Sequence, residues 1–91
     1  MYVYEIKPHL QRILKKLAKK DSQMYRQLMN KIGEVISSSD IEHYKNLRYD
    51  MKDQKRVHLG QFVLVFQYNK QANLISFEDF DHHDGIYKRK N

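Results

Sequence analysis

The chain has 91 residues, with 17 Lys and Arg against 11 Asp and Glu and a formal net charge of +6, and its length predicts a single domain over 1–91. The lack of cysteine excludes a disulfide framework and thiolate metal sites, and no apolar stretch approaches the ~20 residues that span a bilayer, so we expect a cytoplasmic protein without a membrane partner. The positive charge instead favours a polyanionic partner such as nucleic acid or an acidic protein.

The N-terminal half predicts a short strand followed by two helices. Residues 1–7 alternate around Val3 and Ile6, and Pro8 suits the first turn of a helix. Asp21 and Ser22 mark a break and a new N-cap. Apolar residues at helical spacing give both helices an apolar stripe, namely Leu10, Ile13, Leu14 and Leu17 and then Tyr25, Leu28, Met29, Ile32 and Ile36. We expect an antiparallel helical hairpin that ends near residues 37–39.

The C-terminal half predicts a β-meander after an irregular stretch over 40–54, in which Ile41, Tyr44 and Leu47 could anchor a turn against the core. The expected strands cover 55–59, 62–68 and 74–80, joined by a tight turn at 60–61 and a loop at 69–73. Residues 62–68 are apolar on both faces, which is typical of a central strand. The predicted fold class is α+β: a small, mostly antiparallel sheet in the order β-α-α-β-β-β, with an N-terminal helical hairpin packed on one face.

The strand over 55–59 offers the first candidate site. If Val57 and Leu59 face the helices, Arg56 and His58 lie on the open face of the sheet. Arginine can bind phosphate oxygens through a fork of donors, and histidine can transfer a proton near neutral pH. An ordinary solvated face is the alternative interpretation of the same pattern.

A second cluster of titratable residues follows the last predicted strand. We expect His82 and His83 to flank a shallow groove with His58, while Tyr87 and the basic Lys88-Arg89 trail along its edge. Imidazoles, cations and a phenol suit the cleavage of RNA by its own 2′-OH, which needs a base, an acid and a stabilising positive charge. This chemistry requires neither a metal nor another cofactor.

Two other interpretations of this cluster stay open. Asp79, Asp81, His82, His83 and Asp84 are a conceivable metal-ligand set, although neighbours on an extended segment point opposite ways and no familiar metal-binding spacing is present. The histidines could also be solvated or could cap a structural element.

The order of elements and two motifs resemble the RelE/ParE superfamily of type II toxins. The resemblance covers essentially the whole chain and is carried by Leu47-Arg48, by the run over 55–66 and by Asp81-His82-His83-Asp84-Gly85-Ile86-Tyr87. The strongest local matches are Arg56, Gly60, His82 and Tyr87, with Phe62 in place of the family's aromatic residue.

The resemblance implies a toxin that cleaves mRNA in the ribosomal A site and is neutralised by a cognate antitoxin, with no small-molecule cofactor. Four residues are expected to act in catalysis, namely His58, His82, His83 and Tyr87. Five are expected to bind RNA or phosphate, namely Arg48, Lys55, Arg56, Lys88 and Arg89. An acidic antitoxin tail would suit the cations that the helices expose.

Two departures from the family pattern keep other functions open. Val63 and His83 stand where family members carry arginine, and an apolar Val63 cannot bind phosphate. The chain either runs a histidine-based variant of the cleavage or has weak or lost nuclease activity. The alternatives are a ParE-like toxin that inhibits gyrase without enzymatic activity, and a catalytically degenerate module that binds antitoxin or RNA.

Overall fold

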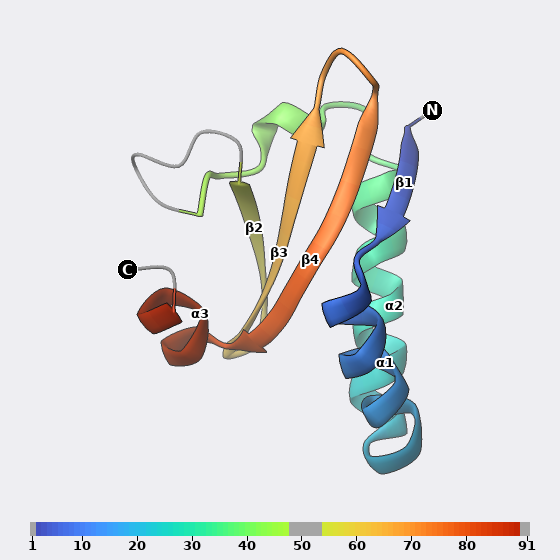
Figure 1. The fold of residues 1–91 in the computed structure, drawn as a ribbon, viewed down its shortest axis with the longest axis vertical. Coiled ribbons are helices and arrows are strands. Elements are labelled where there is room, and N and C mark those ends of the chain that lie inside the picture. Colours follow the sequence, from blue (N-terminus) through green and yellow to red (C-terminus); the bar gives the residue numbers. More distant parts are fainter. Residues whose placement is uncertain (1, 48–53, 90–91) are drawn as a thin grey trace.

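The computed structural model describes residues 2–47 and 54–89, and it has the predicted order of elements with two short helices added (Figure 1). The elements are β1 (Val3–Ile6), α1 (Pro8–Lys20), α2 (Ser22–Ile36), a short 3-10 helix η1 (Ile41–His43), β2 (Gln54–Leu59), β3 (Phe62–Asn69), β4 (Leu74–His82) and α3 (His83–Arg89). The predicted α+β class and the order β-α-α-β-β-β are therefore confirmed, and η1 and α3 are the additions. No helix within the described residues is long and apolar enough to cross a membrane.

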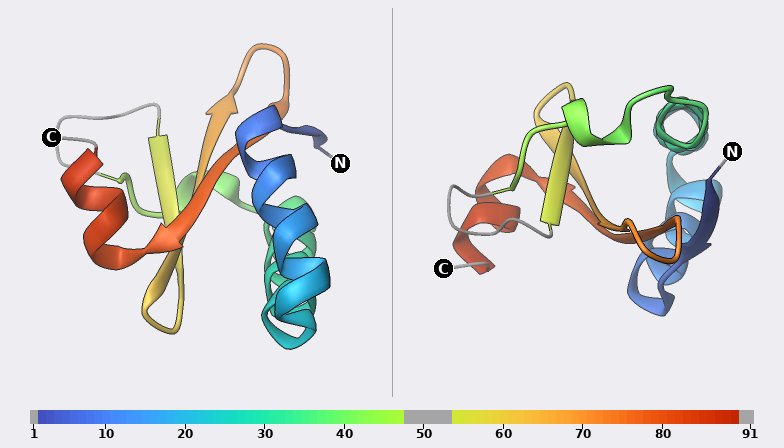
Figure 2. Two further views of the ribbon diagram at one scale, coloured as in Figure 1. Left: turned by 60° about the horizontal axis from the view of Figure 1, so that its bottom comes forward. Right: turned by 90° about the horizontal axis from the view of Figure 1, so that it is seen from above.

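The four strands form one mixed sheet in the order β1-β4-β3-β2. The pairs β2–β3 and β3–β4 are antiparallel, whereas β1 runs parallel to β4. The prediction of a mostly antiparallel sheet is confirmed. The sheet lies between two helical layers, with α1 and α2 on one side and α3 on the other (Figure 2).

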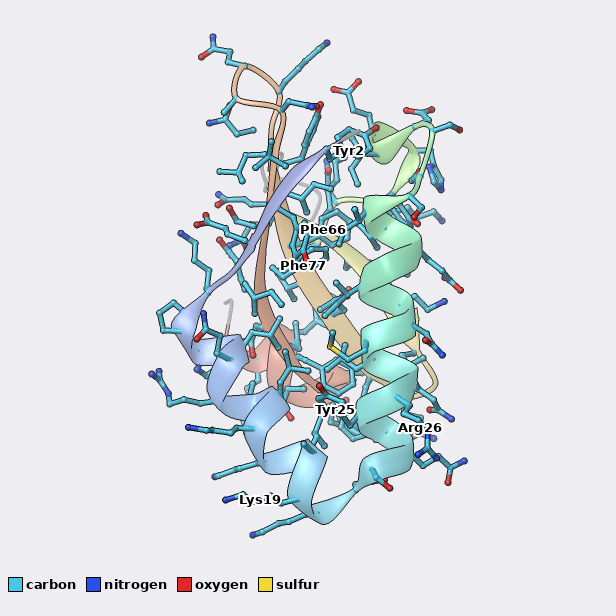
Figure 3. The ribbon with its side chains drawn as sticks, turned by 90° about the vertical axis from the view of Figure 1, so that its right-hand side faces the viewer. Tyr2, Lys19, Tyr25, Arg26, Phe66 and Phe77 are labelled. Carbon is cyan, nitrogen blue, oxygen red and sulfur yellow. The ribbon has the colours of Figure 1, made fainter. Side chains whose placement is uncertain are left out.

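Asp21 separates the two long helices, as the sequence predicts. Its backbone N–H donates to the Leu17 carbonyl at the end of α1, and its side chain accepts a hydrogen bond from Met24 N at 3.1 Å. One residue thus closes α1 and caps α2, because a side-chain oxygen satisfies an amide that the first turn leaves without a partner. The tight junction folds the two helices into the predicted hairpin (Figure 3).

The main core fills the space between this helical hairpin and the sheet. Phe66 and Phe77 lie at its centre, with their ring centroids 5.9 Å apart, and both are fully buried (Figure 3). Around them pack Leu10, Leu14, Leu28, Ile32, Val35, Ile41, Leu64, Ile75 and Phe80. Ile41 is 2% exposed, so the predicted anchor in the irregular stretch is confirmed.

A second, smaller core lies on the other face of the sheet. Val63 and Val65 of β3 pack there against Leu47 and Ile86, and all four are buried. This explains why β3 is apolar on both faces: Leu64 and Phe66 face the first core, and the valines face the second. The prediction that residues 62–68 form the central strand is confirmed in this sense.

The structure corrects the prediction for the C-terminal segment. The last strand does not stop at residue 80 but continues to His82, and residues 83–89 form α3 rather than a trailing tail. The physical reason is Ile86, which is fully buried against the second core. A single apolar residue beside Gly85 produces no helical periodicity, so the sequence pattern carried no signal for this helix.

Candidate active site

The turn between β2 and β3 brings two distant segments together. Gly60 adopts a left-handed conformation with φ +62°, which a side chain would strain, and this lets the chain reverse within two residues. The carbonyl of Gln61 then accepts a hydrogen bond from His83 N at 2.8 Å. The turn therefore holds the first residue of α3 beside the end of β2.

A shallow depression of about 480 Å³ forms where these segments meet. We call it the histidine groove, and it is lined by His58, Gly60, Gln61, His82, His83 and Asp84. Three of the four predicted catalytic residues line it, and the fourth, Tyr87, lies beside it. The predicted convergence of His58 with the C-terminal histidines is what the structure shows.

Three side chains that can transfer protons lie in a row. The rings of His58 and His83 are nearly parallel, with their centroids 6.0 Å apart and 21° between their planes. The ring of Tyr87, one helical turn further along α3, lies 4.7 Å from His83. The side chain of His83 is 52% exposed, so a substrate can reach it.

Arg56 shares the open face of β2 with His58. In the sheet register Arg56 pairs with Val65 and His58 with Val63, and both valines face away from the helical hairpin. The pKa of His58 is lowered from its ordinary value by desolvation, by the nearby positive charge of Arg56 and by the proximity of His83, although the side chain is exposed. A neutral imidazole next to a guanidinium is suited to accept a proton close to a bound phosphate.

His82 has a different environment from His83, although the two are neighbours. The backbone N–H of Asp84 donates to Nδ1 of His82 at 3.2 Å, so this nitrogen is unprotonated. Nε2 of His82 lies 3.2 Å from Oε1 of Gln61, and since an amide oxygen can only accept, Nε2 is the donor of this hydrogen bond. Both nitrogens of His82 are thus used to cap α3 and join it to the turn, as one of the open alternatives anticipated for these histidines.

Asp81 and Gly85 fix the position of the first turn of α3. Oδ1 of Asp81 accepts a hydrogen bond from His82 N at 2.7 Å. A Cβ atom at position 85 would lie 2.6 Å from the other carboxylate oxygen, closer than such atoms approach in proteins. Gly85 therefore permits the helix to sit directly on the Asp81 carboxylate.

The predicted phosphate-binding residues do not all reach the histidine groove. Lys55 pairs with Phe66 and faces the helical side of the sheet, where its ammonium donates to the carbonyl of Tyr44 at 3.1 Å. Lys88 is exposed on α3. Arg48 and the side chain of Arg89 lie outside the described residues. Of the predicted phosphate-binding side chains that the structure describes, Arg56 is the one placed beside His58.

Val63 is fully buried beneath α3, as part of the second core. The position to which the family resemblance assigns an arginine is therefore a packing position in this chain. A charged side chain at that position would displace α3 or remain unsolvated, and neither is compatible with the second core.

Sequence reasoning missed a long-range side-chain contact between α1 and β4, outside the groove. Nε2 of His9 on α1 lies 3.0 Å from Oδ1 of Asp79, a residue that is 6% exposed. The pair joins the helical hairpin to β4. Residues 70 positions apart leave no local signal in a single sequence.

The His and Asp residues of the C-terminal cluster were considered above as possible metal ligands. Within residues 2–47 and 54–89, no three His, Asp or Glu side chains converge in a way that could hold a metal ion. The acids of the C-terminal cluster instead make local contacts, such as the hydrogen bond from Phe80 N to Asp79.

Comparisons with known proteins agree with this fold. No protein-family model matches the chain. A protein of Methanocaldococcus jannaschii named "Putative toxin RelE4" is 45% identical over 91 residues, covering 99% of this chain and 95% of the relative. A chain of the E. coli DinJ-YafQ complex superposes with a TM-score of 0.72 at 15% identity, covering 96% of this chain and 99% of that one. A chain of the intact E. coli RelBE toxin-antitoxin complex superposes with a TM-score of 0.68 at 24% identity, covering 90% of this chain and 96% of that one.

Proposed function

The chain belongs to the RelE-like family of type II toxins, and on this premise we propose that it is a ribosome-dependent endoribonuclease that cleaves mRNA and inhibits translation. The observation that supports this proposal is the row formed by His58, His83 and Tyr87 beside Arg56. These are the residue types that RNA cleavage by the 2′-OH needs.

In the proposed reaction the ribose 2′-oxygen attacks its neighbouring 3′-phosphate. The O2′–P bond forms as the P–O5′ bond breaks, leaving a 2′,3′-cyclic phosphate and a 5′-hydroxyl. One group removes the proton of the 2′-OH, and another gives a proton to the departing 5′-oxygen. The positive charge of Arg56 stabilises the extra negative charge on the phosphorane between these two steps.

The environments of the two stacked histidines favour a division of roles. The lowered pKa of His58 favours its neutral form, which suits the base that accepts the 2′-OH proton. His83 is exposed and adjacent to Tyr87, which suits the acid that protonates the 5′-oxygen, with Tyr87 assisting. We assign His82 to the capping of α3 because both of its ring nitrogens are occupied there.

We further propose that a cognate antitoxin neutralises the protein in the cytoplasm. Toxins of the same fold have been solved with their antitoxins, as in the RelBE and DinJ-YafQ complexes. The excess of basic residues favours an acidic partner that covers part of the toxin surface.

The test is cleavage of a defined mRNA by the purified protein, with and without programmed ribosomes. We expect ribosome-dependent cuts whose products carry a 2′,3′-cyclic phosphate and a 5′-hydroxyl. His83→Gln should lower the rate by about 10²–10⁴-fold, the usual contribution of a general acid or base. His43→Gln is the matched control, since His43 is an exposed histidine in η1 outside the groove.

A second variant separates capping from catalysis. Asparagine is a good N-cap residue but cannot act as an acid or base near neutral pH, so His82→Asn should retain most of the activity. Equal losses in His82→Asn and His83→Gln would refute the roles assigned here. Absence of any ribosome-dependent cut by the unmodified protein would refute the nuclease function itself.

A further inference from the structure

The histidine groove holds little positive charge for a reacting phosphate. None of its lining residues is Lys or Arg, and one of them, Asp84, is an acid. Arg56 lies beside His58, but Val63 is buried beneath α3 at the position to which the family resemblance assigns an arginine. The negative charge that develops on a phosphorane therefore needs hydrogen-bond donors in addition to one guanidinium.

Most donors around the groove already have a function. The backbone N–H of His83 donates to the carbonyl of Gln61 at 2.8 Å, and that of Asp84 donates to Nδ1 of His82 at 3.2 Å. The rings of His58 and His83 are assigned to the transfer of protons. The Asp84 carboxylate can only accept. Among the lining residues, the side-chain donor that remains is the amide of Gln61.

The contact with His82 determines which end of the Gln61 amide is available. Oε1 of Gln61 accepts the hydrogen bond from Nε2 of His82 at 3.2 Å. The nitrogen lies on the other side of the amide carbon and carries two N–H groups. Gln61 is exposed, and within the described residues no protein group accepts a hydrogen bond from this nitrogen. A substrate in the groove can therefore accept one.

We propose that Gln61 is a further catalytic residue, whose amide N–H groups donate to a non-bridging oxygen of the scissile phosphate. The inference rests on the proposed function, because it assigns a role in the same reaction. Gln61 transfers no proton: the O2′–P bond forms as the P–O5′ bond breaks, and the hydrogen bonds from Gln61 strengthen as negative charge builds on the phosphorane oxygens. Arg56 on β2 and Gln61 on the turn then stabilise the same charge.

The main chain holds Gln61 at this place. Gly60 with its φ of +62° reverses the chain, and the bond between the Gln61 carbonyl and His83 N ties the turn to the first residue of α3. The position of Gln61 therefore does not depend on the side chain of His82. Loss of the Gln61 amide should reduce cleavage far more than His82→Asn does.

The first test compares two replacements of Gln61. Gln61→Glu keeps an oxygen that accepts from His82 but has no N–H to donate, whereas Gln61→Met has a similar length and offers neither. Both should lower kcat for mRNA cleavage by about 10²–10³-fold, the usual cost of one lost oxyanion donor. Gln71→Glu, at an exposed glutamine in the loop after β3, adds the same charge and should leave the rate unchanged. A large loss in Gln61→Met alone would mean a structural role and would overturn the proposal.

A substrate with sulfur in place of one non-bridging oxygen tests the contact itself. Sulfur is a poorer hydrogen-bond acceptor than oxygen, so the unmodified protein should cleave one diastereomer of this phosphorothioate more slowly than the other. Gln61→Met should reduce the difference between the diastereomers. Glutamine can also contact base edges. A changed sequence preference in Gln61→Met, together with an unchanged difference between the diastereomers, would therefore overturn the phosphate contact.

A binding measurement separates this proposal from the nuclease function. Oligo(U) with 2′-O-methyl riboses has no free 2′-OH and cannot react, so it can be added to the ¹⁵N-labelled protein. We expect the NMR signals of the Gln61 side-chain amide to shift, while those of Gln71 stay in place. A shift in a protein that cleaves no mRNA would refute the nuclease function but support the contact with RNA. Unmoved Gln61 signals with bound oligo(U) would overturn the contact, even in an active nuclease.

Discussion

Ile86 is predicted to hold the proposed active site together, although it takes no part in the chemistry. It is the fully buried side chain through which α3 packs on Val63 and Val65. A seven-residue helix is far too short to be stable by itself in water, so its structure depends on this contact. Ile86→Ala removes a buried side chain at a cost of about 2–5 kcal/mol. Since ~1.4 kcal/mol is a factor of ten in an equilibrium constant, the ratio of docked to undocked α3 should fall at least about 25-fold.

Native-state hydrogen exchange measures this directly. We expect the amides of α3 to lose protection in Ile86→Ala while those in the centre of β3 keep most of theirs, because the main core lies on the other face of the sheet. Cleavage activity should fall with the docked population, as His83 leaves His58. Ile86→Val is the matched control and should cost only about 0.5–1.5 kcal/mol. Unchanged α3 protection in Ile86→Ala, or equal loss of protection in β3, would refute the reasoning.

Three further predictions concern single residues. Arg56→Gln removes a charge that lowers the pKa of His58, so the pKa of His58 should rise and less of the neutral base should be present at low pH. The acid limb of the pH–rate profile should therefore move to higher pH, and an unmoved limb argues against His58 as the base. His9→Ala takes a donor from the buried Asp79 carboxylate and should lower the urea-unfolding free energy by about 1.5–3 kcal/mol, with partial recovery in His9→Gln. Gly60→Ala places a side chain at φ +62° and should cost about 1–2 kcal/mol, whereas Gly60→Asn should cost less; equal urea midpoints for the two would contradict this.

The main elements of the fold were predictable because their signals are local and repeated. The apolar stripes of α1 and α2, the cap at Asp21 and the alternation along β2 each depend on neighbours within a few residues. The parallel pairing of β1 with β4 was not predicted, since a contact between residues 3 and 74 leaves no pattern in either segment. The helix α3 was missed for a related reason, because its stability comes from the distant Val63 and Val65.

The candidate site was predictable as a set of residues but not as a set of roles. The alternation of Arg56 and His58 along a strand placed both on one face, and the structure agrees. The same alternation along the strand should have excluded Lys55 from the predicted phosphate site, because Lys55 points to the opposite face and its ammonium donates to the Tyr44 carbonyl. His82 and His83 are indistinguishable in sequence, and only the cap of α3 shows that their surroundings differ.

The sheet order also bears on when the protein can become active during its own synthesis. β1 is the first strand to leave the ribosome. Its partner in the sheet is β4, which ends at residue 82 and connects β1 to the other strands. The nascent chain therefore carries an unpaired first strand until almost all of the described residues have emerged. Since α3 follows β4, the histidine groove is assembled last of all. Under the proposed function, the nuclease site cannot form on a nascent chain before residues 83–89 have emerged from the ribosome.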